Sequence, residues 1–368
     1  MRAAAAAVAV MLAVTVVTAC SRAPSEGQTG RNSAQSVSAQ GPRAPEAGQA
    51  GPVARTRDDL LDTVITITVY DGTDAGIIDD AFERIAAIEK AMSATLQGSE
   101  IRALSDCAGK SPATLSDETY RVVKEAYEMS IESGGAFNLA VGPLVRLWGV
   151  HTEAARVPGA AEIEAALNLT DYNDVVLSDG DKSVYLKREG MGVDLGAIAK
   201  GYAGDAAAQI LKDGGSGHAI LDLGGNIVAI GGNPNGDEWK IGVRDPIEGG
   251  CGYIAVVRVR DKAVVTSGAG ERYFESGGRR YHHIFDSSTG YPAESGLLSV
   301  TIIADNSAEA DKLSTAAFVL GLQGGLRLLE NYKGAEAVFI TDGFEVYVTP
   351  GLKSSFALAD DRFSLANE

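Results

Sequence analysis

The spacing of short strand patterns and turn signals is the feature that most restricts the fold of this chain. Threonine alternates with apolar residues over 63–70, which is typical of a half-buried strand. Asp179-Gly180 and Asp342-Gly343 each separate two such runs and predict tight hairpins. Segments 75–94 and 116–133 instead carry apolar residues at helical spacing, and Ser116 is the expected cap of the second. Helices are also expected over 307–320 and 325–331. Because strands and helices do not alternate regularly, the pattern predicts an α+β fold with largely antiparallel sheets and packed helices rather than a doubly wound parallel fold.

The N-terminus has the pattern of a secretory signal peptide. Arg2 precedes an apolar run, rich in Ala and Val, that is too short to span a membrane. Residues 1–19 are therefore predicted to be a signal peptide. The run ends in Val17-Thr18-Ala19-Cys20, which resembles a bacterial lipobox, so Cys20 is the expected lipidation site. Two or more acyl chains would anchor the protein stably at a membrane. The alternative is a plain signal peptide that happens to end in Cys.

The segment after Cys20 predicts a tether and then one folded domain. Residues 20–56 consist mainly of Gly, Ser, Ala, Gln and Pro, a composition that cannot bury enough apolar surface to fold. We therefore expect a flexible linker over 20–56, a folded domain over 57–356 and a C-terminal tail over 357–368. The chain has 3 Cys residues, so a disulfide framework is not expected. One bridge between Cys107 and Cys251 is conceivable, although two isolated thiols are the simpler interpretation.

The charge of the chain limits its partners. A formal net charge of −17 argues against nucleic acid, whose phosphates require clusters of Lys and Arg. An acidic protein can still bind a polyanionic cofactor where a metal ion supplies positive charge.

The segment 192–205 carries the strongest local signal for a ligand. Val193 to Leu195 are expected to close a short strand, and a helix is expected from about Ala197 to Leu211. A helix that opens at a glycine points free N–H groups and the positive end of its dipole at whatever lies in front, which suits a phosphate. Asp194 and Lys200 add one charge of each sign at this turn. The alternative is an ordinary strand-to-helix connection with a solvated lysine.

A second candidate is the glycine-rich stretch that follows the helix expected over 116–133. Gly134-Gly135 would allow the backbone to approach a flat ligand closely, and the Phe137 ring could pack on it. The alternative is a helix C-cap followed by core aromatic residues.

Polar residues near the C-terminal end complete the candidates. Asp311 and Thr315 lie one helical turn apart, so their oxygen atoms share a face and suit Mg²⁺ when backbone carbonyls, waters and phosphates complete the shell. The alternative is a surface Asp and a Thr bonded to its own helix. His282 and His283 are adjacent, so in a strand only one of them can face a cleft and move a proton.

At these residues the chain resembles the ApbE family of FAD:protein FMN transferases, a set of secreted or lipid-anchored bacterial proteins. The resemblance covers roughly 60–352, and six motifs occur in the family's order. These are Ser133-Gly-Gly-Ala-Phe-Asn with Gly142-Pro-Leu and Leu147-Trp-Gly, Val193-Asp-Leu-Gly-Ala-Ile-Ala-Lys-Gly-Tyr-Ala, Leu223-Gly-Gly-Asn, Thr266-Ser-Gly, Tyr281-His-His-Ile-Phe-Asp with Thr289-Gly-Tyr-Pro, and Ala310-Asp-Lys-Leu-Ser-Thr.

The resemblance implies an ApbE-like (T-fold-like) architecture and a defined reaction. Such proteins bind FAD with Mg²⁺ and attach its FMN half, through a phosphoester, to a Thr or Ser hydroxyl of a target protein, releasing AMP. The implied FAD contacts are Ala136, Phe137, Asn138, Asp194, Lys200 and Ile284. The metal would take the main-chain oxygen of Ala197 and the side chains of Asp311 and Thr315, and His283 would be the general base. The implied location is the extracytoplasmic face of a cell membrane, through the lipid anchor.

The chain departs from the family's pattern at a few positions. Asn138 stands where the family usually has Asp, Asp286-Ser-Ser-Thr-Gly replaces Asp-Pro-x-Thr-Gly, and Leu61-Asp62-Thr63 replaces Met-Gly-Thr. Two other functions stay open. The same site would act as an Mg²⁺-dependent FAD pyrophosphatase if water replaced the hydroxyl, and a lipid-anchored protein that binds FAD without catalysis would need neither the Asp311/Thr315 pair nor His283.

Overall fold

The computed structural model describes residues 51–72, 74–150, 152–247 and 252–366. The predicted signal peptide, Cys20 and the linker up to residue 50 lie outside these ranges, as does Cys251 of the conceivable disulfide bridge. Cys107 is a free thiol. Within the described part of the chain, no helix combines the length and the apolar character that a membrane span requires.

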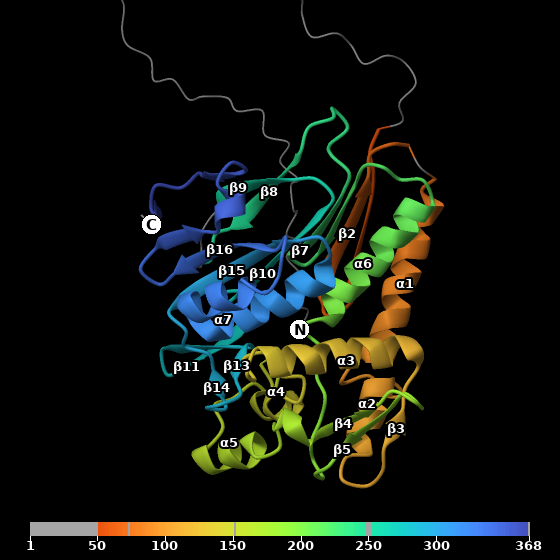
Figure 1. Cartoon of the computed structure of the whole chain (residues 1–368), viewed down its shortest axis with the longest axis vertical. Coiled ribbons are helices and arrows are strands. Elements are labelled where there is room, and N and C mark those ends of the chain that lie inside the picture. Colours follow the sequence, from red (N-terminus) through yellow and green to blue (C-terminus); the bar gives the residue numbers. More distant parts are fainter. Residues whose placement is uncertain (1–50, 73, 151, 248–251, 367–368) are drawn as a thin grey trace, which may run out of the picture. The chain divides into compact units, whose positions relative to one another are not determined.

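The centre of the molecule is a nine-stranded sheet in the order β1-β2-β6-β7-β10-β15-β16-β17-β19 (Figure 1). Every pairing in it is antiparallel except the short parallel contact between β17 and β19. Its strands are β1 (Val53–Leu60), β2 (Thr63–Val69), β6 (Ala219–Leu223), β7 (Asn226–Ile230), β10 (Lys262–Gly268), β15 (Leu297–Ala304), β16 (Glu336–Thr341), β17 (Glu345–Val348) and β19 (Ser364–Leu365). The prediction of an α+β fold with largely antiparallel sheets is confirmed.

Smaller sheets surround this centre. Their strands are β3 (Ala113–Thr114), β4 (Val175–Ser178), β5 (Ser183–Leu186), β8 (Trp239–Arg244), β9 (Tyr253–Val259), β11 (Tyr273–Ser276), β12 (Arg279–His282), β13 (Phe285–Asp286), β14 (Tyr291–Pro292) and β18 (Phe356–Leu358). The predicted hairpin across Asp179-Gly180 is the β4–β5 pair.

The helices of the described residues are α1 (Gly76–Met92), α2 (Glu100–Asp106), α3 (Asp117–Glu132), α4 (Gly142–Trp148), α5 (Ala160–Leu167), α6 (Ala199–Asp213) and α7 (Ser307–Leu329). The Ser116 side chain accepts a hydrogen bond from Thr119 N–H and caps α3, as the sequence predicted. The two helices expected over 307–320 and 325–331 correspond to α7, which is divided by a kink at Gly321. The break has φ +71°, a conformation that glycine adopts without strain.

The two faces of the nine-stranded sheet have different covers. Helices α6 and α7 pack on one face, and α1 packs against α6 (Figure 1). On the other face, apolar residues of β8 and β9 meet those of β10, β15 and β16 and form a second core. The helices on the first face, α6 and α7, carry the candidate residues Lys200, Asp311 and Thr315.

The expected domain limits need two corrections. The linker was expected to extend to residue 56, but β1 begins at Val53 and pairs with β2 along the sheet edge. The tail expected over 357–368 also belongs to the fold. Strand β18 pairs with β9, and β19 pairs with β17. These short terminal strands have little periodicity of their own and are fixed by their partners.

Candidate functional site

The chain before α6 forms a turn that brings Asp194 next to backbone N–H groups. The strand expected at Val193–Leu195 is not formed; this stretch is irregular, and Asp194 N–H donates to the Leu139 carbonyl at 2.9 Å. The Asp194 carboxylate accepts a hydrogen bond of 2.8 Å from Gly196 N–H. Burial raises the pKa of Asp194, while this bond and the charge of Arg146 act in the opposite direction. Ala197 and Lys200 follow at the start of α6.

Asp311 of α7 reaches the N-terminus of α6. Its Oδ2 atom accepts a 2.9 Å hydrogen bond from Gly201 N–H, one of the N–H groups that a helix start leaves without a partner. Its Oδ1 atom lies 3.7 Å from the Lys200 ammonium. The Asp311 side chain is only 4% exposed, so the two helices hold this carboxylate in one position. The structure therefore brings together Lys200 and Asp311, which the sequence placed far apart.

Thr315 extends the same face of α7 by one turn. Its hydroxyl lies 3.3 Å from the Ser267 hydroxyl of β10, which also contacts Ser314 at 2.8 Å. Asp311 and Thr315 are oxygen donors of the kind that Mg²⁺ prefers. Among the described residues no group of three or more His, Cys, Asp or Glu side chains is placed to hold a metal. A metal here would therefore need backbone carbonyl, water or phosphate oxygen as well, and the residues present fit such a magnesium site.

Asn226 is a further member of this cluster, and the sequence analysis gave it no role. It is the first residue of β7, and its Oδ1 atom accepts a 2.8 Å hydrogen bond from Lys200 Nζ. The Leu223-Gly-Gly-Asn motif was the available signal. Gly224 and Gly225 have φ values of +65° and +103°, and a Cβ atom on Gly224 would lie 1.9 Å from Thr63 Oγ1. The glycines thus make the tight turn that places Asn226.

The stretch after α3 places its aromatic ring in the core. Phe137 is 2% exposed and packs in the main core, so its ring has no open face for a flat ligand, and a contact with FAD through its main chain stays a prediction. The Asn138 side chain donates to the Thr170 carbonyl and accepts from Ala140 N–H, each at 2.8 Å. Ala136 is half-buried. Ser287 donates to the Gly135 carbonyl at 2.8 Å, which joins this stretch to the segment after His283.

The two adjacent histidines have different surroundings. His282 is buried, its Nε2 atom lies 3.0 Å from the Ala293 carbonyl oxygen, and burial lowers its pKa. His283 is half-buried, and its backbone N–H donates to the Arg272 carbonyl at 3.1 Å. Arg272 in turn donates to the Asp62 carbonyl at 2.9 Å, beside Leu61. Ile284, next to His283, is 5% exposed. His283 is therefore the more accessible of the two candidate bases.

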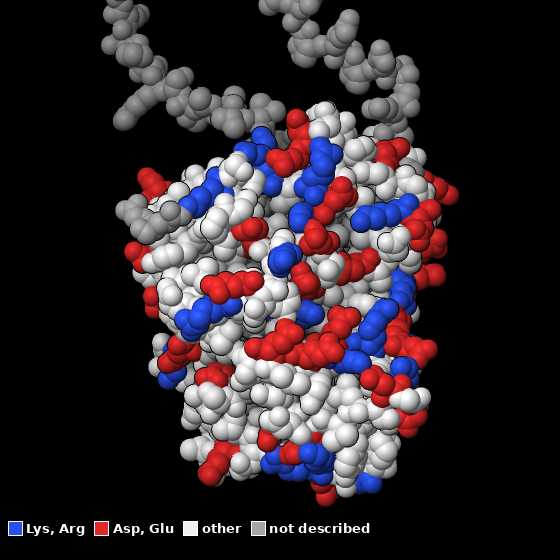
Figure 2. Space-filling model, in the orientation of Figure 1, with Lys and Arg blue, Asp and Glu red and all other residues white. Residues whose placement is uncertain are grey.

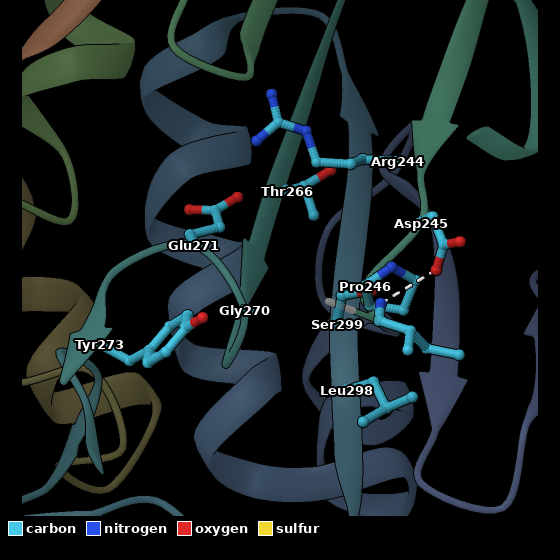
Figure 3. A pocket seen from close by; sticks show the side chains of 11 residues that line it. Arg244, Asp245, Pro246, Thr266, Gly270, Glu271, Tyr273, Leu298 and Ser299 are labelled. Atoms are coloured by element: carbon cyan, nitrogen blue, oxygen red, sulfur yellow. Dashed lines mark hydrogen bonds between the residues drawn. The ribbon is translucent and has the colours of Figure 1, made fainter. Parts of the chain in front are cut away.

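A pocket on the other face of the sheet lies beyond this cluster and was not predicted (Figure 3). Arg244 at the end of β8 and Glu271 after β10 both line it, and their charged ends lie on the same side in this view. Burial raises the pKa of Glu271, and the charges of Lys200 and Arg244 oppose the rise. Its lining residues are Arg244, Asp245, Pro246, Ile247, Thr266, Gly268, Gly270, Glu271, Tyr273, Leu298 and Ser299. Glu271 follows the Thr266-Ser-Gly motif, which was the only sequence signal for it.

The charged groups around the start of α6 suit a phosphorylated ligand. A diphosphate binds N–H groups at a helix N-terminus and an ammonium such as that of Lys200, and it binds a carboxylate only through a divalent cation that the carboxylate holds. On the face drawn in Figure 2, acidic and basic side chains are interspersed and form no continuous basic surface. The charges at the start of α6 therefore suit a small anionic ligand, and the drawn face has no basic surface for an extended polyanion.

Comparison with known proteins agrees with this geometry. Residues 61–339 match the model of the ApbE family. A FAD:protein FMN transferase of Treponema pallidum is 38% identical over 83% of this chain and 89% of its own length. A FAD:protein FMN transferase of Klebsiella pneumoniae is 33% identical over 83% of this chain and 95% of its own length.

Solved structures give the same result. The crystal structure of the ApbE protein of Thermotoga maritima superposes with a TM-score of 0.76 at 34% identity, covering 83% of this chain and 99% of that one. The flavin transferase ApbE of Vibrio cholerae superposes with a TM-score of 0.74 at 27% identity, over 83% of this chain and 99% of that one. The chain belongs to the ApbE family.

Proposed function

We propose that this protein is an Mg²⁺-dependent FAD:protein FMN transferase that acts on a Thr or Ser hydroxyl of a target protein. The observation that carries the proposal is Asp311, which contacts the N-terminus of α6 through one oxygen and faces Lys200 with the other. The relatives named above act on FAD and a protein by their names. The Lys200 ammonium and the start of α6 would bind the diphosphate of FAD. Asp194, Ala136, Asn138 and Ile284 would surround the rest of the cofactor, together with the main chain of Phe137, whose ring is in the core.

The metal would be held by Asp311, Thr315 and the carbonyl oxygen of Ala197. When bound, Mg²⁺ neutralises the diphosphate and favours departure of the leaving phosphate. His283 would take the proton of the acceptor hydroxyl. The hydroxyl oxygen then forms a bond to the phosphorus of the FMN half, and the bond between that phosphorus and the oxygen of AMP breaks. Lys200 would offset charge on the diphosphate while this bond breaks.

We propose further that Cys20 is lipidated and that the folded domain acts on the extracytoplasmic side of a cell membrane. The support is the sequence Val17-Thr18-Ala19-Cys20 after an apolar run. Mass spectrometry of the purified chain tests this: a mature protein that starts at Cys20 and carries acyl chains agrees with the proposal, and an unmodified Cys20 contradicts it.

The catalytic proposal is tested with the full chain in detergent, FAD, Mg²⁺ and a protein that carries a Thr in a loop of small residues. A covalent FMN adduct on that Thr, together with AMP, supports the transferase. Free FMN and AMP without an adduct would instead favour the FAD pyrophosphatase. Bound but unchanged FAD would leave a binding protein without catalysis.

A further inference from the structure

Asn226 is buried in the nine-stranded sheet beside Lys200. It lies opposite Leu223 in the β6–β7 hairpin and opposite Val265 of β10, so β7 is held from both sides. The residue is 1% exposed. A side chain on a central strand that is buried to this extent has little freedom to change its rotamer.

The contact with Lys200 determines the orientation of the Asn226 amide. An ammonium group has three donors and no acceptor, so the atom that faces Lys200 Nζ at 2.8 Å must be the carbonyl oxygen Oδ1. The Nδ2 amino group then points away from the ammonium. The contact with Lys200 therefore determines which of the two amide atoms is oxygen and which is nitrogen, because the shape of the amide group does not distinguish them.

The Nδ2 atom is buried and has no hydrogen-bond partner among the described residues. A buried donor without an acceptor is costly, and folded proteins rarely retain one without a reason. Here the donor shares a side chain with the acceptor that holds Lys200, in the cluster that also contains Asp311. The missing partner must therefore be an acceptor, and a cation next to it favours one that is negatively charged.

We propose that Asn226 is a binding residue for the diphosphate of FAD, donating a hydrogen bond from Nδ2 to a phosphoryl oxygen while its Oδ1 atom holds Lys200. The inference rests on the proposed function for the identity of the ligand. It adds a second role to Asn226, because a residue that only positioned Lys200 would need no donor.

A double-mutant cycle with Lys200 separates the two roles. FAD affinity is measured by flavin fluorescence for the wild type, Asn226→Ala, Lys200→Met and the double variant, with Mg²⁺ present. If Asn226 bonds to the ligand directly, Asn226→Ala weakens FAD binding about 10-fold even in the Lys200→Met background. If Asn226 acted only through Lys200, the substitution would have no effect in that background, and the proposal would be overturned.

Asn226→Asp provides a second test, because it retains an oxygen that can accept from Lys200 and loses the donor. We expect it to weaken FAD binding at least as much as Asn226→Ala, since a carboxylate would face the phosphate. Wild-type affinity in this variant would contradict the proposal. Asn233→Asp is the matched control, because it adds the same charge in a turn where the Asn233 Oδ1 atom accepts hydrogen bonds from the backbone N–H groups of Asn235 and Asp237.

The melting temperature of the ligand-free protein provides a readout that does not depend on the ligand. Because the alanine removes an unsatisfied buried donor, Asn226→Ala in the Lys200→Met background should melt no lower than Lys200→Met alone. A clear fall would mean that Nδ2 already has a structural partner. FAD affinity and melting temperature can both be measured whether or not the FMN adduct forms. A failure of the transferase proposal would be recognised separately, from the absence of the adduct with the wild-type protein.

Discussion

Two carboxylates, that of Asp205 and that of Asp311, join α6 and α7 through different contacts. Asp205 of α6 accepts hydrogen bonds from Ser307 N–H at 2.7 Å and Ala308 N–H at 2.8 Å, so both of its oxygens cap the start of α7. Asp311 of α7 caps the start of α6 with one oxygen and faces Lys200 with the other. Each helix thus closes the N-terminus of the other, but only Asp311 keeps an oxygen directed at a charged group. We infer that Asp205 serves the fold and Asp311 serves the chemistry.

The backbones of α6 and α7 approach each other so closely at Gly201 that no side chain fits between them. A Cβ atom on Gly201 would lie 2.2 Å from the Ser307 carbonyl oxygen. The glycine therefore permits the close approach that both carboxylates need.

The largest effect is expected for Asp311→Asn. The amide can still accept the hydrogen bond from Gly201 N–H, but it loses the negative charge that faces Lys200 and would hold a metal. We expect FMN transfer to fall about 1,000-fold with a small change in melting temperature. The measurement is the rate of AMP release with FAD and acceptor in excess. A rate within a few-fold of the wild type would refute the role of Asp311.

The second prediction concerns pH and Asp205. Burial raises the pKa of Asp205 from 3.8 to about 6, with the two backbone N–H bonds and Lys212 opposing the rise and Asp311 adding to it. A pKa that is higher in the folded state means that the contribution of this group to stability is complete below about pH 4 and is lost as the pH rises through about 6.

Relative to Asp205→Asn, which does not titrate, the free energy of unfolding of the wild type should therefore fall by up to about 3 kcal/mol between pH 4 and pH 7. Urea denaturation of both proteins across this range measures the difference. A constant difference would show that the pKa of Asp205 is the same in the folded and unfolded states.

Asp205→Ala should lower stability at neutral pH because it leaves the N–H groups of Ser307 and Ala308 without acceptors. We expect a loss of about 2 kcal/mol in the free energy of unfolding. FAD affinity should change less than it does in Asp311→Asn, as measured on the folded protein. If Asp205→Ala abolished FAD binding while the fold persisted, the division of roles between the two carboxylates would be wrong.

The smallest effect is expected for Thr315→Val, which keeps the shape of the side chain and removes its hydroxyl. We predict a fall of about 10-fold in the rate of transfer and an unchanged melting temperature. Thr315→Ser retains the hydroxyl and is the matched control. Equal rates of transfer for Thr315→Val and Thr315→Ser would show that the Thr315 hydroxyl has no role in the reaction.

The sequence predicted the elements whose signals are local. The alternation over 63–70, the Ser116 cap and the Asp-Gly hairpins each act within a few residues, and all appear in the structure. The helix α2 (Glu100–Asp106) was not predicted; it is short and capped by Ser99. Strands β1 and β19 were also missed. Both are edge strands, and they become extended by pairing with the neighbouring strands rather than through a sequence pattern of their own.

The site could be predicted only in part, because its geometry depends on packing. The prediction of a phosphate site at the start of α6 rests on residues adjacent in sequence. The capping of α6 by Asp311, and the contact between Lys200 and Asn226, bring together residues that only the packed helices and sheet place side by side. Phe137 shows the other side of this dependence: the sequence allowed its ring either a ligand or the core, and packing places the ring in the core.

The central claim is that Asp311, and not Asp205, carries the chemistry at the contact between α6 and α7. The most direct test compares wild type, Asp205→Asn and Asp311→Asn in one experiment, with mass spectrometry of the acceptor protein and chromatography of AMP. We predict an FMN adduct and an equal amount of AMP for the wild type and Asp205→Asn, and neither product for Asp311→Asn. Adduct formation by Asp311→Asn at the wild-type rate, or loss of transfer in a folded Asp205→Asn protein, would contradict the claim.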